Sequence, residues 1–193
     1  DAEEWDFVGK VAAASSPAVR RMHEWPERQP YESMLQFHTS GGLAAVWAEE
    51  NTRDALFAGM KRREAYATSG PRMTLRFFAG WGMDKVSCQS PDFIARAYEH
   101  GVPMGAELHA ADVESQGPVF LASATRDPGR SAGLLQRIQI IKSWVDREGA
   151  THQAVYDVAG DPANGASVDP NSCAVSGEGF NQLCATWRDP DFD

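Results

Sequence analysis

The chain has 193 residues, with 18 Lys and Arg against 27 Asp and Glu, which gives a formal net charge of −9. Its 42% hydrophobic content argues against a disordered chain, and its length suits one or two domains. The negative charge and the lack of a basic stripe argue against nucleic acid as a partner. No apolar run approaches the roughly 20 residues that span a bilayer, so no transmembrane segment is predicted.

The first third of the chain combines a long polar segment with one helix. Residues 1–35 are broken by three prolines, which predicts an irregular surface segment. A helix is predicted over about 52–64, because Asn51 suits the N-cap and apolar residues share one face of the segment. A short strand is expected over 66–68, ending where Ser69 begins a turn.

After residue 72 the hydrophobic pattern changes from helical to strand-like periodicity. A strand is predicted near 73–77, and a helix over 91–100 with Ser90 as N-cap and Gly101 as terminator. Further strands are expected over 118–125, 134–145, 152–158 and 183–187. Several strands with little helix between them predict an antiparallel sheet or sandwich.

The cysteine spacing leaves two interpretations open. Cys88 stands alone, whereas Cys173 and Cys184 bracket a short loop with two glycines. That loop fits a disulfide or a pair of reduced thiols equally well. No Cys belongs to a C-x-x-C pair and no His lies near the cysteines, so no zinc site is predicted.

One dense polar cluster stands at the start of the predicted helix, formed by Glu49, Glu50, Asn51 and Arg53. The free N–H groups of a helix N-terminus can bind an anion. From the residues alone the favoured interpretation is structural. Asn51 would cap the helix, and the two glutamates would interact favourably with the positive end of its dipole. The five His residues form no H-x-H or H-x-x-x-H pair, so no metal ligands are predicted in the chain.

Long segments of the chain resemble a bacterial family described as domain of unknown function 3604. The resemblance begins with GLAAVWAEENTR over 42–53 and KRREAYATSGPR over 61–72. It continues through RFFAGW over 76–81, GVPMG over 101–105, LQRIQIIK over 135–142, VYDVAG over 155–160 and WRDPDFD over 187–193. That family is similar to the polymerase-and-histidinol-phosphatase superfamily of metal-dependent hydrolases.

This resemblance implies an α/β plus all-β fold. Residues 1–72 would be the C-terminal piece of an incomplete (β/α) barrel with a long loop. Residues 73–193 would form a β-sandwich-like, mainly antiparallel domain with one inserted helix. The sequence has neither the H-x-H nor the D-x-H of the superfamily. The chain is therefore expected to be a C-terminal fragment whose partner is the upstream barrel portion of the same protein, where a divalent metal is the expected cofactor.

The parent protein is expected to hydrolyse a phosphoester or similar ester on that metal. The catalytic residues stay unidentified, and this chain alone is expected to be inactive and to hold no metal tightly. Helices of a (β/α) barrel begin on the catalytic face. The residues predicted to contact a small anionic substrate are therefore Glu49, Glu50, Asn51, Arg53 and Arg72.

Two further expectations accompany the resemblance. The family's likeness to exported proteins favours a periplasmic or exported location over a cytoplasmic one, and with it a Cys173–Cys184 disulfide that leaves Cys88 unpaired. The alternative function is a non-catalytic β-sandwich module with a binding or structural role. Exposed aromatic side chains such as Trp81 or Trp144, gathered on one face of the sandwich, would favour that alternative.

Overall fold

The computed structural model describes residues 42–110, 117–129 and 133–192, so the segment predicted over 1–35 lies outside the described residues. The chain divides into two units, one of Asp1–Ala44 and Ala67–Gly70, the other of Ala45–Tyr66 and Pro71–Asp193. Strands β1 (Leu43–Val46) and β2 (Ala65–Thr68) pair with each other and belong partly to each unit. The features described below all lie in the second unit.

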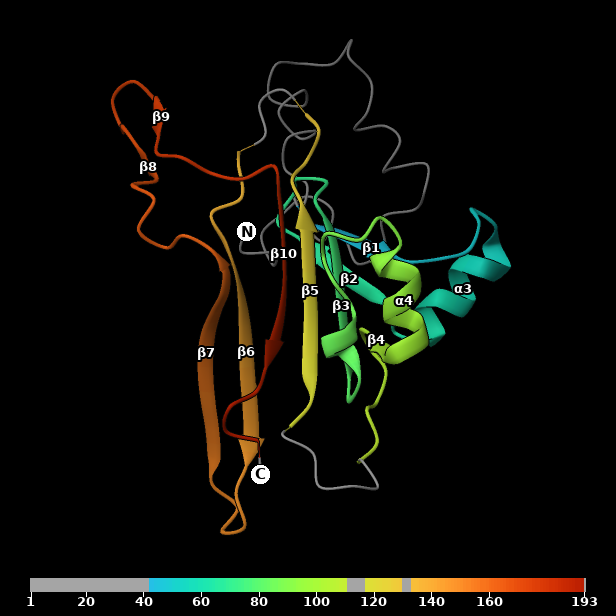
Figure 1. The fold of residues 1–193 in the computed structure, drawn as a ribbon. Helices are drawn as coiled ribbons and strands as arrows, with labels where there is room; N and C mark the ends of the chain where they lie inside the picture. Colours follow the sequence, from blue (N-terminus) through green and yellow to red (C-terminus); the bar gives the residue numbers. More distant parts are fainter. Residues whose placement is uncertain (1–41, 111–116, 130–132, 193) are drawn as a thin grey trace, which may run out of the picture. The chain divides into compact units, whose positions relative to one another are not determined.

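A four-stranded antiparallel sheet in the order β10-β5-β3-β4 forms the centre of this unit (Figure 1). Its strands are β3 (Thr74–Gly80), β4 (Val102–Pro103), β5 (Val119–Thr125) and β10 (Gln182–Arg188). The inner strand β5 is apolar on both faces, because Leu121 and Ala122, which point to opposite sides, are both buried. Both faces of the sheet are therefore available for packing.

One face of the sheet packs against helical segments. The 3₁₀ helix η3 (Met83–Lys85) and helix α4 (Phe93–His100) contribute Met83 and Ala97 to a core that also contains Phe78 and Leu121. All four side chains are at most 1% exposed. Among the helices of the described ranges, none is long and apolar enough to cross a membrane.

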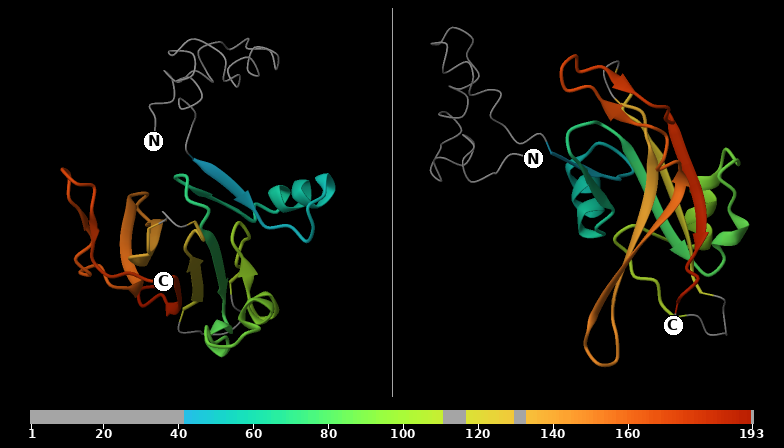
Figure 2. Two further views of the ribbon diagram at one scale, coloured as in Figure 1. Left: turned by 90° about the horizontal axis from the view of Figure 1, so that it is seen from above. Right: turned by 90° about the vertical axis from the view of Figure 1, so that its left-hand side faces the viewer.

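The opposite face packs against a long hairpin of β6 (Arg137–Val145) and β7 (Thr151–Gly160). Ile138 of β6 meets Ala122 and Leu183 of the sheet in a second core. Figures 1 and 2 show α4 and the hairpin on opposite sides of the sheet. A smaller pair, β8 (Ser167–Val168) and β9 (Val175–Ser176), lies between β7 and β10 in the sequence.

The segment that follows β10 is fastened to the hairpin by charge. The ammonium of Lys142 lies 2.7 Å from the carboxylate of Asp189, whose side chain is only 4% exposed. Lys142 also donates to the backbone carbonyl of Asp191 at 2.7 Å, and the Tyr156 hydroxyl donates to the Asp191 carboxylate at 3.3 Å. These bonds hold the chain in place as far as Phe192.

The predicted strands are confirmed, and the β-rich, mainly antiparallel organisation of the domain is confirmed with them. The second helix begins later than predicted, at Phe93, and its N-cap is Asp92 rather than Ser90. Ser90 instead donates its hydroxyl to the Asp92 carboxylate. Gly101 ends the helix as predicted, but in an extended conformation with φ −161°. The barrel piece and the domain boundary after residue 72 stay predictions.

Candidate functional site

The predicted polar cluster precedes helix α3 (Arg53–Lys61). The N-cap is Thr52 and not Asn51, because the Thr52 hydroxyl accepts the N–H of Ala55 at 3.3 Å. The same hydroxyl donates to the Glu50 carboxylate at 3.0 Å. A threonine can both accept and donate in this way, so it links the helix start to the preceding acid.

The five predicted site residues do not converge on one hollow. Glu49 lines one hollow, whereas Asn51 and Arg53 line another along the apolar side of α3. Arg72 is exposed, and its backbone N–H donates to the Asp127 carboxylate at 2.6 Å. The structure thus places the predicted residues in separate environments and leaves their role in substrate binding a prediction.

The hollow that Glu49 lines has a volume of about 580 Å³, and four of its eight lining residues are charged. The segment between β1 and α3, the end of α3, β3, α4 and β4 all contribute to it. Its lining residues are Trp47, Ala48, Glu49, Arg62, Glu64, Arg76, Tyr98 and Pro103. We call it the Glu64 hollow, because a buried carboxylate organises it.

Glu64 is only 4% exposed. The Tyr98 hydroxyl donates to its carboxylate, and the guanidinium groups of Arg62 and Arg76 each lie 3.6 Å from it. The backbone is held as well, since the Glu64 N–H donates to Gly59 and the Glu64 carbonyl accepts from Trp47. A buried carboxylate is costly unless it is paired and hydrogen-bonded, and Glu64 meets both conditions.

Arg76 is fixed on two sides. Its guanidinium carbon lies 3.3 Å from the centroid of the Trp47 ring, and its Nη1 donates to the Tyr98 hydroxyl at 2.9 Å. The Trp47 indole itself donates to the carbonyl of Leu75 at 2.9 Å, so the ring is anchored on strand β3. Stacking on an aromatic face and a fixed fork of donors are the properties that suit Arg to anion recognition.

Tyr98 keeps its proton over the neutral range. Burial in the first place, and then the hydrogen bond to Glu64, raise the pKa of Tyr98 above its ordinary value of 10. Its hydroxyl therefore stays a donor to the carboxylate while accepting from Arg76. Of the charged side chains that line the hollow, Arg62 and Arg76 balance Glu49 and Glu64.

The sequence reasoning missed Glu64, Arg76 and Tyr98 as site residues. Glu64 was assigned to the end of the helix and Arg76 to the polar face of a strand. The resemblance could have pointed to two of them, because Glu64 and Arg76 lie within the segments that resemble the family. The tertiary contacts that bury Glu64 could not be inferred from spacing.

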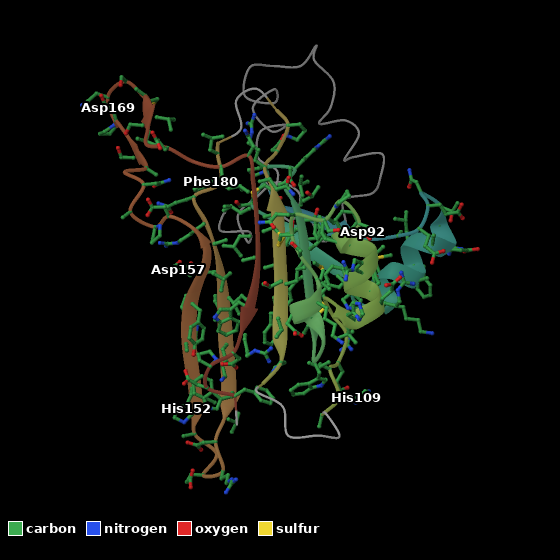
Figure 3. The ribbon with its side chains drawn as sticks, in the orientation of Figure 1. Asp92, His109, His152, Asp157, Asp169 and Phe180 are labelled. Carbon is green, nitrogen blue, oxygen red and sulfur yellow. A yellow bond between two sulfur atoms is a disulfide. The ribbon has the colours of Figure 1, made fainter. Side chains whose placement is uncertain are left out.

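The described residues contain no group of three or more His, Cys, Asp or Glu arranged to hold a metal ion. Figure 3 shows His109 and His152 well apart on separate segments. The donor set in this part of the chain therefore does not fit a metal centre. The charged side chains of the Glu64 hollow are of the kind that contacts charged groups.

The predicted disulfide pairing is wrong. Cys184 of β10 is bonded to Cys88, which follows η3, with 5.8 Å between their Cα atoms. Cys173 is exposed and free. The side chain of Cys184 points to the helical face of the sheet and joins the core that contains Met83, where Cys88 approaches. The short loop before Cys184 instead contains β9, which pairs with β8.

A family model described as "Protein of unknown function (DUF3604)" matches residues 1–193. Comparison with curated proteins and with solved structures gives no significant match. The match covers the segments that build the Glu64 hollow.

Proposed function

The chain belongs to the DUF3604 family, and we propose that it is the C-terminal part of a metal-dependent hydrolase acting on a phosphoester or similar ester. The reaction class rests on the family's resemblance to the polymerase-and-histidinol-phosphatase superfamily. In that reaction the metal would activate water. The metal ligands are proposed to lie in an upstream barrel, and this chain is proposed to supply the cleft wall and substrate contacts.

The Glu64 hollow carries the proposal. A buried carboxylate holds two guanidinium groups on one wall of the hollow, in a chain of net charge −9. Arg76 is held too firmly to move far, whereas the Arg62 side chain is 50% exposed. The Arg62 guanidinium lies 3.6 Å from Glu64, beyond hydrogen-bond range, so it can turn toward an anion.

The apolar side of α3 supports the proposed barrel. Phe57 and Met60 are 63% and 56% exposed, which leaves an apolar stripe on a short helix. A helix in a barrel buries such a stripe against its neighbours. Asn51 and Arg53, at the start of the same helix, and Glu50 and Arg72 stay proposed as further substrate contacts.

Anion binding by the purified 193-residue chain tests the role of the hollow. Inorganic phosphate and phenyl phosphate would be titrated and followed by NMR chemical shifts. We expect Arg62→Ala to weaken binding by about tenfold or more, as for a lost charge-assisted contact. Arg147→Ala is the matched control, because Arg147 is an exposed arginine in the turn between β6 and β7. Equal binding by wild type and Arg62→Ala would contradict the proposal.

The fragment interpretation has its own test. The chain alone is proposed to be inactive and to bind no metal tightly. Titration with Mn²⁺ or Zn²⁺, together with an assay on a generic phosphoester, would check both statements. Stoichiometric tight binding with turnover would contradict them.

An exported or periplasmic location is proposed as well. The Cys88–Cys184 disulfide supports it, because such bonds persist in oxidising compartments. Thiol labelling of the protein in intact cells would test the location. A reduced Cys88 in the native host would count against it.

A second candidate function is a non-catalytic binding or structural module. The observation that favours it is a hollow lined by Phe77, Trp81, Phe120 and Phe192. Phe77 follows Arg76 in β3, and successive strand residues point to opposite faces of a sheet. This hollow therefore lies on the other face of the sheet from Arg76. If the full-length parent hydrolyses its substrate and Arg62→Ala reduces that turnover, the result would favour the hydrolase over the binding module.

A further inference from the structure

We propose that the hollow between β3, β5 and the C-terminal segment, here called the aromatic groove, is a binding site for a small molecule with an uncharged planar aromatic ring. The groove has a volume of about 420 Å³. Ligand sites for small molecules span roughly 300–1,000 Å³. This volume suits a ring system of one or two fused rings.

Two aromatic rings form the floor of the aromatic groove. The rings of Phe77 and Phe120 stack with their centroids 5.7 Å apart and their planes 14° from parallel. Both residues lie on the sheet face that carries Ala79, which leaves room above the floor because its side chain is small. An aromatic ligand can contact these rings in an offset-stacked or edge-to-face arrangement, the two geometries that aromatic pairs prefer.

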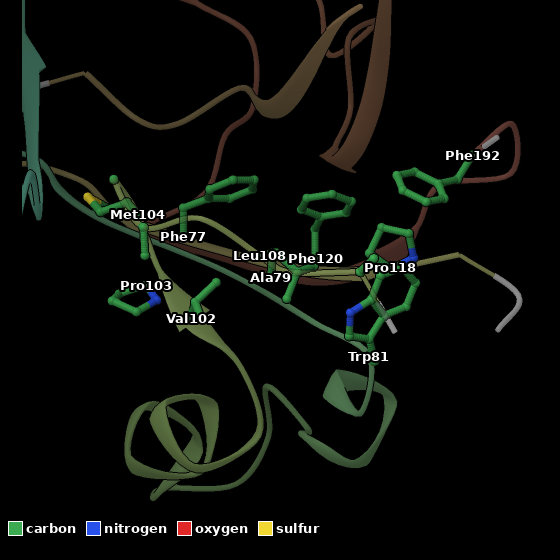
Figure 4. A pocket seen from close by; sticks show the side chains of 13 residues that line it. Phe77, Ala79, Trp81, Val102, Pro103, Met104, Leu108, Pro118, Phe120 and Phe192 are labelled. Carbon is green, nitrogen blue, oxygen red and sulfur yellow. The ribbon is translucent and has the colours of Figure 1, made fainter. Parts of the chain in front are cut away.

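Two aromatic side chains form the wall at one end of the groove. Trp81 and Phe192 meet edge to face, with centroids 5.8 Å apart and planes at 77°. The Trp81 indole N–H already donates a hydrogen bond to the His109 carbonyl at 2.8 Å, so a ligand need not supply an acceptor for it. Figure 4 shows Trp81 and Phe192 at the end of the groove opposite Pro103 and Met104.

The wall is built by the fold. Phe192 follows the segment that Lys142 fastens through Asp189 and the Asp191 carbonyl. Gly117 has φ +87°, and a Cβ there would stand only 3.2 Å from the Cβ of Phe192. A glycine at this position therefore lets the C-terminal segment close against the start of β5.

The chemistry of the lining selects the ligand. All 13 lining residues are apolar or glycine, so a charged ligand group would be desolvated in the groove without a partner. Phe192 itself is 49% exposed. Partly exposed aromatic side chains that gather in a hollow are typical of a binding site. The inference rests on the groove alone and holds under either proposed function.

The test uses the 193-residue chain and the uncharged fluorescent probe N-phenyl-1-naphthylamine. We expect saturable binding at one site per chain in the wild type. Phe192→Ala removes the end wall, and Ala106→Trp places a large ring at the exposed rim. Each is expected to weaken probe binding by about tenfold. Because both positions are exposed, each variant is expected to stay folded, as melting curves would verify.

Matched controls keep the assay specific. Phe57→Ala removes an exposed ring from α3, and Ala163→Trp adds a ring to an exposed loop; both are expected to bind the probe like wild type. Absence of saturable binding in the wild type would overturn the proposal, as would equal binding in Phe192→Ala and Ala106→Trp. A dimer in light scattering that both groove variants dissociate, without probe binding, would overturn it in favour of a second copy as the occupant.

Discussion

Tyr98 donates its phenolic hydrogen to the carboxylate of Glu64, which lies 34 residues earlier in the chain. The bond joins helix α4 to the turn between α3 and β2. The carboxylate is nearly inaccessible to water, so its hydrogen-bond and ion-pair partners take the place of solvent. One buried acid thus connects the elements that form the Glu64 hollow.

Replacing Glu64 tests this connection. Glu64→Gln keeps the shape of the side chain but removes the counter-charge of Arg76, whose side chain is only 20% exposed. We expect the free energy of unfolding to fall by about 1.5–3 kcal/mol, the range for hydrogen bonds to charged groups. Urea unfolding would measure it. Glu99→Gln, at an exposed position on α4, is the control, and equal losses in both variants would contradict the role of Glu64.

Local rules predicted the elements of this chain well and their ends less well. Asn51 and Thr52 are adjacent residues that both favour the N-cap position, and a shift of one residue lies below what such rules can separate. In the sequence Glu64 follows three basic residues at the end of the predicted helix, and nothing in that position indicates burial. Its burial comes from Tyr98 and Arg76, which approach from other elements.

The alternation of apolar and polar residues in β6 also shows that a local pattern does not predict contacts between distant elements. In the sequence, Ile138, Ile140 and Trp144 alternate along one face of the predicted strand, and Lys142 interrupts them. The structure explains this lysine, because Lys142 forms an ion pair with Asp189, which follows the end of β10. The disulfide was predicted wrongly for a similar reason, since Cys88 and Cys184 are 96 residues apart and meet only after the sheet has formed. Pairs of this kind depend on the fold.

The disulfide should contribute strongly to stability. In the chain-entropy account, a loop of about 100 residues gives about 4.7 kcal/mol. We expect Cys88→Ser to lower the melting temperature under non-reducing conditions and to remove the effect of dithiothreitol. Cys173→Ser should change neither. A thiol titration of the unreduced wild type that finds three free thiols would contradict the Cys88–Cys184 bond.

The tip of the β6–β7 hairpin carries a titratable pair. The His152 ring nitrogen lies 2.6 Å from the Asp146 carboxylate and, as the leading cause, lowers the pKa of Asp146 below 3.8. A lowered pKa in the folded state means that the stabilisation is present above pH 3.8 and is lost as the pH falls through the folded pKa. Carboxyl ¹³C NMR should show the Asp146 pKa rising toward 3.8 in His152→Ala. An unchanged pKa would contradict the pairing.

Arg72 separates a structural role from a functional one. Its backbone N–H is bonded to Asp127, so Arg72→Ala keeps that bond and should shift the melting temperature by no more than about 2 °C. If Arg72 contacts an anionic substrate in the parent hydrolase, kcat/KM should fall by about ten- to hundredfold. Unchanged kinetics in the full-length protein would remove Arg72 from the proposed substrate contacts.

Replacing Lys142 should destabilise the fold strongly. In Lys142→Met the Asp189 carboxylate, with a side chain only 4% exposed, is left without its counter-charge. Breaking a buried pair from one side costs about 3–5 kcal/mol, whereas replacing both partners with apolar groups costs less. We therefore expect the double variant with Asp189→Leu to unfold at higher urea than Lys142→Met alone. Lys85→Met, at an exposed position, is the control. Because the same pair holds Phe192, Lys142→Met should also weaken binding of the naphthylamine probe, which would link the buried charge to the aromatic groove.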